Sequence, residues 1–286
     1  MVQTVQDILD QLDKEFAVSS LPAHVAVQQT KKPTEQKQTP AKPKEAWEEL
    51  LDKAEEFRRQ EKWTEALAVY NLAVIRFREE HIYFHFMHGK IRVLKELGRH
   101  EDMQQAAKEL VQAYDKKIAL EGDYHPFFDN YRGKARAFFE AEMYEEVCLC
   151  FEEWISVAKN QRPPVSPHLI PSTNPDRMIA LEKCGRYGEV LQAYAEEIRK
   201  HTDLPFPGKY VPYFNMALVL ERMGRIEEAI PFLDEVIRVE PDKGRQIQAL
   251  GYKCRFLRQL GRNEEAKEAD FQEKLLKQLE DSNARA

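Results

Sequence analysis

A six-residue signature recurs six times along this chain and restricts its possible folds more than any other feature. Its copies are EKWTEA (61–66), GRHEDM (98–103), EMYEEV (142–147), GRYGEV (185–190), GRIEEA (224–229) and GRNEEA (261–266). The last residues of successive copies lie 37 (66 to 103) to 44 (103 to 147) positions apart. A repeat of about 34 residues with loops of variable length gives such intervals. The recurrence therefore predicts an array of equivalent helical units.

The positions of the signature have separate physical roles. Four copies open with Gly, which most easily adopts the left-handed conformation that ends a helix. An acid stands at the fifth position of all six copies, where it would meet the positive end of the next helix. Small or apolar residues recur at the last position and also seven residues before each copy: Ala54, Ile91, Ala135, Met178, Ala217 and Cys254. Each copy is thus predicted to be the turn of a tightly packed helical hairpin.

One stretch carries a family resemblance. Residues Asn215 to Pro241, NMALVLERMGRIEEAIPFLDEVIRVEP, resemble a complete tetratricopeptide repeat (TPR) with its closing proline, and Trp47 to Arg78 is similar. The other copies are degenerate. The resemblance covers about residues 44–279 and implies an all-α superhelix, a TPR-like solenoid of helical hairpins. In the sixth copy Asp270 replaces an apolar or small residue, as a solvated capping helix requires.

The composition indicates further segments around this array. Residues 1–20 are predicted to hold an amphipathic helix, followed by a disordered linker over 21–43 that is rich in Pro, Gln, Lys and Thr. The repeat domain is expected over 44–280, and the proline-rich stretch 160–175 would divide it into halves of three repeats. A disordered tail is expected over 281–286. The apolar stripe of the N-terminal helix consists of Val5, Ile8, Leu9, Leu12 and Phe16.

That N-terminal helix is too short to be stable alone. It would dock in the protein's own groove as an occluding segment, grip a partner, or cap the array. The sequence leaves these possibilities open.

Charge and cysteine content exclude several classes of protein. The net charge of −6 gives no basic footprint for nucleic acid, so no nucleic-acid partner is expected. No stretch approaches the roughly 18 apolar residues of a membrane span, and the N-terminus lacks the basic and apolar regions of a secretory signal. The four cysteines form no CxxC motif and are interpreted as reduced, packing thiols. These features predict a cytoplasmic protein without a membrane partner.

The sequence offers little catalytic chemistry. His81, His85 and His88 share a helix face, but no cysteine lies nearby and only Glu79, Glu80 and Glu96 could complete a metal site. They are interpreted as ordinary histidines, with no metal and no cofactor. Because phosphate loops, GxSxG and HExxH motifs are absent from the sequence, we expect no enzyme.

A binding surface follows from the resemblance, because the first helix of each TPR lines the concave face of the superhelix. The residues expected there are His85, His88, Arg92, Lys95, Arg132, Arg136, Phe139, Val211, Phe214, Leu218, Arg255 and Arg258. The arginines would bind carboxylates through bidentate hydrogen bonds. Val211, Phe214 and Leu218 would form an exposed apolar patch, unless Phe214 packs under the neighbouring helix. The prediction is a scaffold or adaptor that binds an acidic peptide or helix with apolar anchors.

The sequence bears on two further functions. Some TPRs hold chaperone C-termini with a carboxylate clamp of Lys and Asn, but Leu51, Glu55 and Gly89 occupy the corresponding positions, so this activity is not implied. The alternative to a scaffold is a peptide- or signal-responsive regulator whose repeat stack changes shape when the ligand binds.

Overall fold

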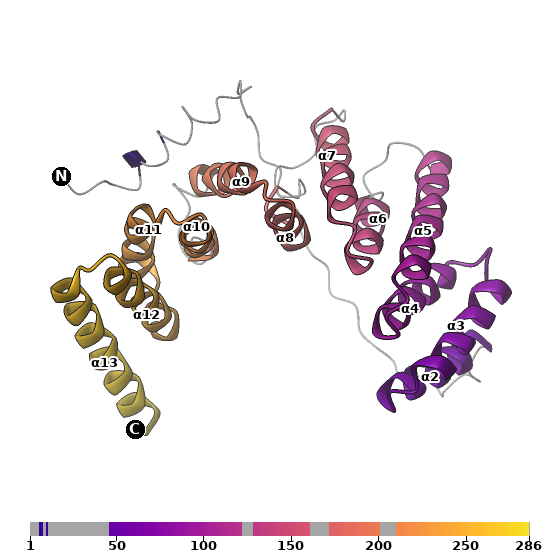
Figure 1. Cartoon of the computed structure of the whole chain (residues 1–286), viewed down its shortest axis with the longest axis horizontal. Helices are drawn as coiled ribbons and strands as arrows, with labels where there is room; N and C mark the ends of the chain where they lie inside the picture. The colour runs from indigo at the N-terminus through magenta and orange to yellow at the C-terminus, as the bar shows by residue number, and fades with distance from the viewer. Residues whose placement is uncertain are drawn as a thin grey trace, which may run out of the picture. The chain divides into compact units, whose positions relative to one another are not determined.

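The computed structural model describes residues 6, 7, 10, 46–121, 128–160, 172–200 and 210–285. Across these residues the chain forms helices α2 to α13, paired as six hairpins, and no strand (Figure 1). Contacts divide the chain into two compact units, residues 20–171 and residues 172–286 with 1–19. Each unit holds three hairpins, so the predicted all-α fold of helical hairpins is confirmed.

Several predictions concern segments outside the described residues. These are the N-terminal stripe (Val5, Ile8, Leu9, Leu12 and Phe16), the linker over 21–43 and most of the proline-rich stretch. Of the N-terminal segment, Gln6, Asp7 and Asp10 are described and helical. The side-chain amide of Gln6 donates a hydrogen bond to Asp10 Oδ1 over 2.8 Å, the i,i+4 spacing of a helix.

The α2–α7 unit contains the first three hairpins. Its helices are α2 (Ala46–Arg59), α3 (Trp63–Arg76), α4 (Ile82–Glu96), α5 (His100–Glu121), α6 (Phe128–Glu140) and α7 (Tyr144–Asn160). Each helix contacts the next, and α4 also contacts both α2 and α6. The first helices of the three hairpins therefore form one continuous wall, and this wall carries the site described below.

The α8–α13 unit contains the other three hairpins. Its helices are α8 (Pro175–Lys183), α9 (Tyr187–Lys200), α10 (Tyr210–Arg222), α11 (Ile226–Val239), α12 (Lys243–Gln259) and α13 (Asn263–Arg285). Asn174 caps α8 by accepting a hydrogen bond from the Asp176 backbone N–H, with Pro175 at the first helical position.

The disordered tail predicted for 281–286 is wrong for residues 281–285, because α13 continues to Arg285. Ion pairs between successive turns, Lys274 with Asp270 and Lys277 with Glu273, stabilise the part of α13 that precedes this segment.

The signature forms the turn inside every hairpin, as predicted. Gly98, Gly185, Gly224 and Gly261 all have φ between 67° and 76°. The two copies without glycine adopt the same conformation, with φ of 55° at Glu61 and 58° at Glu142. In each turn the next backbone N–H bonds to a carbonyl five residues earlier, as from Arg99 to Leu94 over 3.0 Å. The turn geometry is thus shared, and two copies adopt it at the steric cost of a Cβ atom.

The residues flanking each turn are buried, as the packing interpretation requires. The last signature residue is at most 1% exposed in all six copies: Ala66, Met103, Val147, Val190, Ala229 and Ala266. The fifth-position acids lie in the first turn of the second helix, as predicted. In the four Gly-Arg copies they also pair with the signature arginine: Arg99–Asp102, Arg186–Glu189, Arg225–Glu228 and Arg262–Glu265. This second role was not predicted from the sequence.

Candidate protein-interaction surface

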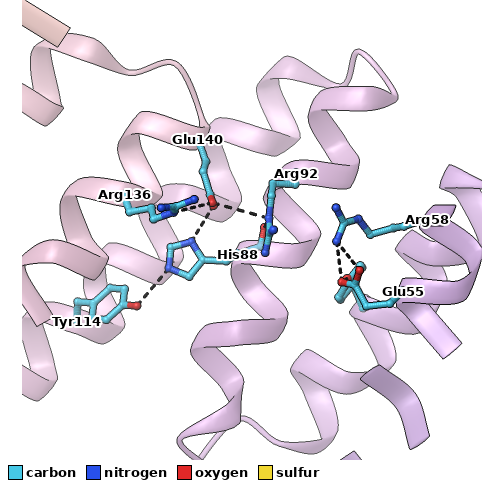
Figure 2. A network of polar contacts seen from close by, with 8 residues as sticks. Glu55, Arg58, His88, Arg92, Tyr114, Arg136 and Glu140 are labelled. Carbon is cyan, nitrogen blue, oxygen red and sulfur yellow. Dashed lines mark hydrogen bonds and ion pairs between the residues drawn. The ribbon is translucent and has the colours of Figure 1, made fainter. Parts of the chain in front are cut away.

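Three polar side chains of α4 and α6 meet around one carboxylate, Glu140, on the wall of the α2–α7 unit (Figure 2). Glu140 Oε2 lies 2.8 Å from His88 Nδ1. Its other oxygen lies 3.2 Å from Arg136 Nε and 3.7 Å from Arg92 Nε. With Tyr114, whose hydroxyl is 3.2 Å from His88 Nε2, these residues form what we call the Glu140 network.

Glu140 is held in its ionised form. Burial disfavours the charge, since only 9% of its side chain is exposed, but the hydrogen bonds from His88 and Arg136 and the charge of Arg92 outweigh that penalty. The pKa of Glu140 is therefore lowered from its ordinary value. An ionised carboxylate that is buried and multiply hydrogen-bonded fixes the position of the groups around it.

Tyr114 closes the network from α5. Its ring packs directly on Gly133 of α6, where an added Cβ would lie 2.3 Å from the ring. Burial and the charge of Glu140 raise the pKa of Tyr114 to about 12, so its hydroxyl keeps its proton. With a proton on Nδ1, His88 donates a hydrogen bond to Glu140, and its Nε2 lies within hydrogen-bond distance of the Tyr114 hydroxyl. The imidazole orientation is thus determined on both sides.

A second acid–base pair on α2 extends the surface. Arg58 NH1 lies 2.6 Å from Glu55 Oε1, which also accepts a hydrogen bond of 2.8 Å from the Tyr70 hydroxyl. Burial opposes ionisation of Glu55, but the hydrogen bonds from Tyr70 and Arg58 dominate and lower its pKa. Arg58, Arg92 and Arg136 therefore come from the first helices of three successive hairpins (Figure 2).

The arginines of this wall retain capacity to bind an anion. Arg92 and Arg136 share the single charge of Glu140, so the Glu140 network carries at least one surplus positive charge. Their side chains are 38% and 60% exposed. Each is bonded through Nε, and a guanidinium carries several further N–H donors. The surface can therefore accept a carboxylate from solution without breaking its internal contacts.

The other predicted residues of this unit lie nearby but outside the network. Lys95 pairs with Glu142 over 2.7 Å, and Arg132 lies 3.5 Å from Asp129 on the same helix. His85 is exposed on α4, and Phe139 is half-buried with its ring edge-on to Tyr144. Only His88, Arg92 and Arg136 of the predicted set are thus joined by contacts around one group.

A pocket of about 350 Å³ lies in the α8–α13 unit, among α8, α9 and α10. Its apolar lining includes Ile179, Val211 and Leu218. Its polar lining includes Asn215, Tyr194 and the ion pair between Arg222 and Glu182. We call this cavity the α10 pocket. Val211 and Leu218, two of the three residues expected to form an apolar patch, line this pocket.

The expectation that Phe214 is exposed is wrong, because its side chain is 6% exposed. Its ring stacks on Tyr210 and meets Tyr252 of α12 edge-on, with both centroid distances 5.1 Å. Phe214 therefore joins α10 to α12 and does not line the α10 pocket. This is the packing alternative that the sequence left open.

The predicted arginines of α12 are engaged within the unit. Arg255 pairs with Glu221 of α10 over 2.7 Å and lies over the Tyr252 ring at 4.6 Å. Arg258 lies 3.8 Å from Asp270 of α13. These contacts tie successive helices together.

The roles of several residues of the two surfaces were not predicted. Glu140 was expected on the same concave face as Arg136, but its role at the centre of the network was not predicted, although its i,i+4 spacing from Arg136 was a usable signal. Ile179 sits in a short helix that follows the proline-rich stretch. Tyr114 lies outside the positions at which the six copies resemble one another, so the repeat pattern did not predict its role.

The described residues contain no group of three His, Cys, Asp or Glu side chains that could hold a metal ion. His88, one of the three histidines considered above, is committed to Glu140 and Tyr114. No helix in the described parts of the chain is both long and apolar enough to cross a membrane. All four cysteines are free thiols, and Cys148, Cys150 and Cys254 are buried, as packing residues should be.

Hairpins that repeat one turn, one set of buried positions and one stacking order define an α-helical repeat protein. The sequence model of the tetratricopeptide repeat matches residues 211–243, which include α10 and α11. Residues 211–243 therefore match this repeat directly, and the other five hairpins share its turn and its buried positions. No curated protein matches the sequence.

Among the similar solved structures, one reaches a TM-score above 0.5 and agrees with this fold. BtubC (BKLC) from P. vanneervenii is similar with a TM-score of 0.51 at 9% identity, covering 83% of this chain and 93% of that one. A candidate kinesin light chain from Podosopora anserina with nearly identical TPR-like repeats gives a TM-score of 0.48 at 15% identity, covering 67% and 93%. At such identities the similarity concerns the fold alone.

Proposed function

We propose that this protein is an interaction scaffold whose α2–α7 unit binds an acidic segment of a partner protein. TPR arrays in general serve protein–protein interaction through their extended surfaces. The observation that carries the proposal is the Glu140 network, in which Arg92 and Arg136 share one buried carboxylate and remain partly exposed. An acidic side chain of the partner would supply the second carboxylate.

The α10 pocket supports the apolar part of the same proposal. Val211 is 55% exposed and Ile179 is 43% exposed beside a cavity large enough for a single side chain. Isolated apolar side chains on a surface need no explanation, but two that border a preformed cavity with hydrogen-bonding groups are typical of an anchor site. We expect a Leu, Met or Phe of a partner to bind there.

The acidic preference can be tested with peptides selected from a random display library on the intact chain. We expect the selected peptides to be enriched in Asp and Glu, and their Kd to rise by about 10-fold or more when Arg92→Gln and Arg136→Gln are combined. Fluorescence anisotropy with labelled peptides measures the Kd.

The control also removes two positive charges, but from a different exposed face. Lys108→Gln combined with Lys116→Gln changes two exposed residues of α5 and should leave the Kd nearly unchanged. Equal weakening by both double variants would mean that only net charge matters, and the assignment of the surface would be rejected.

A further inference from the structure

The last helix, α13, carries an apolar stripe whose residues are about half exposed or more. Phe271, Leu275 and Leu279 of α13 are 66%, 47% and 46% exposed, and their spacing of four places them on one face. Gln272, Gln278 and Ser282 lie beside them and are exposed and uncharged. At 3.6 residues per turn, the charged residues of 271–282 fall on the remaining arc of the helix. These are Glu273, Lys274, Lys277, Glu280 and Asp281.

The stripe is not the face on which a further hairpin would stack. In α3 and α9 the stacking position, nine residues after the signature begins, is a tyrosine that meets the next hairpin. Tyr70 packs on Gly89, and Tyr194 accepts a hydrogen bond from Asn215. In α13 this position is Asp270, which pairs with Lys274 over 2.6 Å. The stacking face of α13 is therefore polar, and the apolar stripe lies on another face of the helix.

We propose that this stripe, defined by Phe271, Leu275 and Leu279, pairs with the same stripe of a second copy in antiparallel orientation. The stripe is symmetric in character about Leu275, with an apolar residue four positions away on each side and a glutamine three positions away on each side. With a two-fold axis at Leu275, Phe271 meets the partner's Leu279 and Leu275 meets its own copy. A two-fold interface requires this kind of self-complementary surface.

The charges bordering the stripe favour the antiparallel order. Glu268, one turn before Phe271, would face the partner's Ser282, which is uncharged. In a parallel pair each charged residue at the border, including Glu268, would lie beside its own copy and like charges would repel. The contact is also small compared with the roughly 800 Å² per partner of a stable complex. The dimer should therefore be weak and concentration-dependent, with a Kd on the order of 10–100 µM.

Sedimentation equilibrium of the intact chain tests the association, over roughly 1–300 µM so as to bracket the expected Kd. We expect monomer at the low end and dimer at the high end. Leu275→Glu places two like charges at the centre of the contact and should weaken association by about 100-fold or more. Ile75→Glu is the matched control, because Ile75 is 77% exposed on α3 and away from the stripe. It should leave the Kd unchanged.

Cysteine crosslinking tests the orientation, in a background with Cys184→Ser because Cys184 is the partly exposed thiol. Leu275→Cys should crosslink with itself. Phe271→Cys and Leu279→Cys should crosslink when mixed, and neither should do so alone. Self-crosslinking by Phe271→Cys would indicate a parallel pair and overturn the proposal.

A chain that stays monomeric at about 300 µM would also overturn it, as would equal weakening by the Ile75→Glu control. If the intact chain is monomeric and dimerises only after deletion of residues 2–16, the N-terminal helix covers the stripe and the proposal of a second copy fails.

Discussion

Replacing Glu140 by Gln removes the carboxylate that His88, Arg92 and Arg136 share while keeping nearly the same shape. The hydrogen bond with His88 is short, at 2.8 Å, and both partners are mostly buried. Hydrogen bonds to charged groups contribute about 1.5–3 kcal/mol each. The arginine contacts are longer and their side chains more exposed, so each contributes less than about 1 kcal/mol. We expect Glu140→Gln to lower the free energy of unfolding by about 2–3 kcal/mol.

Urea denaturation followed by tryptophan fluorescence measures this loss of stability in the α2–α7 unit, which contains Glu140. Trp47, Trp63 and Trp154 all lie in the α2–α7 unit, so the signal follows that unit's unfolding. With a slope of about 1–3 kcal/mol per M, the midpoint should fall by about 0.7–3 M. Glu142→Gln is the control, because its pair with Lys95 is about half exposed, and it should cost less than about 1 kcal/mol. A wild-type midpoint for Glu140→Gln would refute the reasoning.

The stabilities of the wild type and of Glu140→Gln should also depend differently on pH. The pKa of Glu140 is lower in the folded state than its ordinary value near 4.5, so its stabilising effect is complete above that pH. The effect is lost as the pH falls through the lowered, folded-state pKa. The gap between wild type and Glu140→Gln should therefore be constant near neutral pH and shrink below about pH 4.5. A gap that widens in acid would contradict the assignment.

Three further predictions concern packing, turns and thiols. Gly89→Ala places a Cβ 2.3 Å from the buried Tyr70 ring and should destabilise the α2–α7 unit by about 1–3 kcal/mol, measured by the same urea midpoint; an unchanged midpoint would show that Tyr70 moves freely. Glu61→Gly relieves a residue with φ of 55° and should stabilise this unit by about 0.5–1 kcal/mol, whereas a lower midpoint would show that the turn is not strained. Cys148, Cys150 and Cys254 are buried, and burial raises the pKa of Cys150 to about 12. An aromatic disulfide reagent should therefore react with Cys184 alone in the native protein. A second thiol that reacts equally fast would contradict this burial.

The hairpin fold could be predicted because its signals are local and repeated. Glycine at the left-handed turn positions, an acid at the start of the second helix and small residues at the crossings occur in copy after copy, so errors in one copy are corrected by the others. Even Glu61 and Glu142 could be aligned with the glycines by their place in the pattern. The end of α13 was missed because, beyond the last signature, no further copy remained for comparison.

The site was predicted only in part, because the direction of a side chain depends on the neighbouring helix. Arg92 and Arg136 were expected on one face, and they do lie together. Glu140 lies between them because α4 packs against α6, and the sequence of one helix alone does not predict that contact. In some other hairpins the position equivalent to Phe214 is exposed. The Phe214 ring is buried because it packs against Tyr252 of α12.

A double-mutant cycle between Arg136 and an acidic residue of a selected peptide tests the central claim most directly. Arg136→Gln and the peptide's Glu→Gln are measured singly and together by anisotropy. If the guanidinium contacts that carboxylate, the two changes will be coupled by about 1 kcal/mol or more. Additive effects at every acidic position of the peptide would show that the partner does not bind at the Glu140 network.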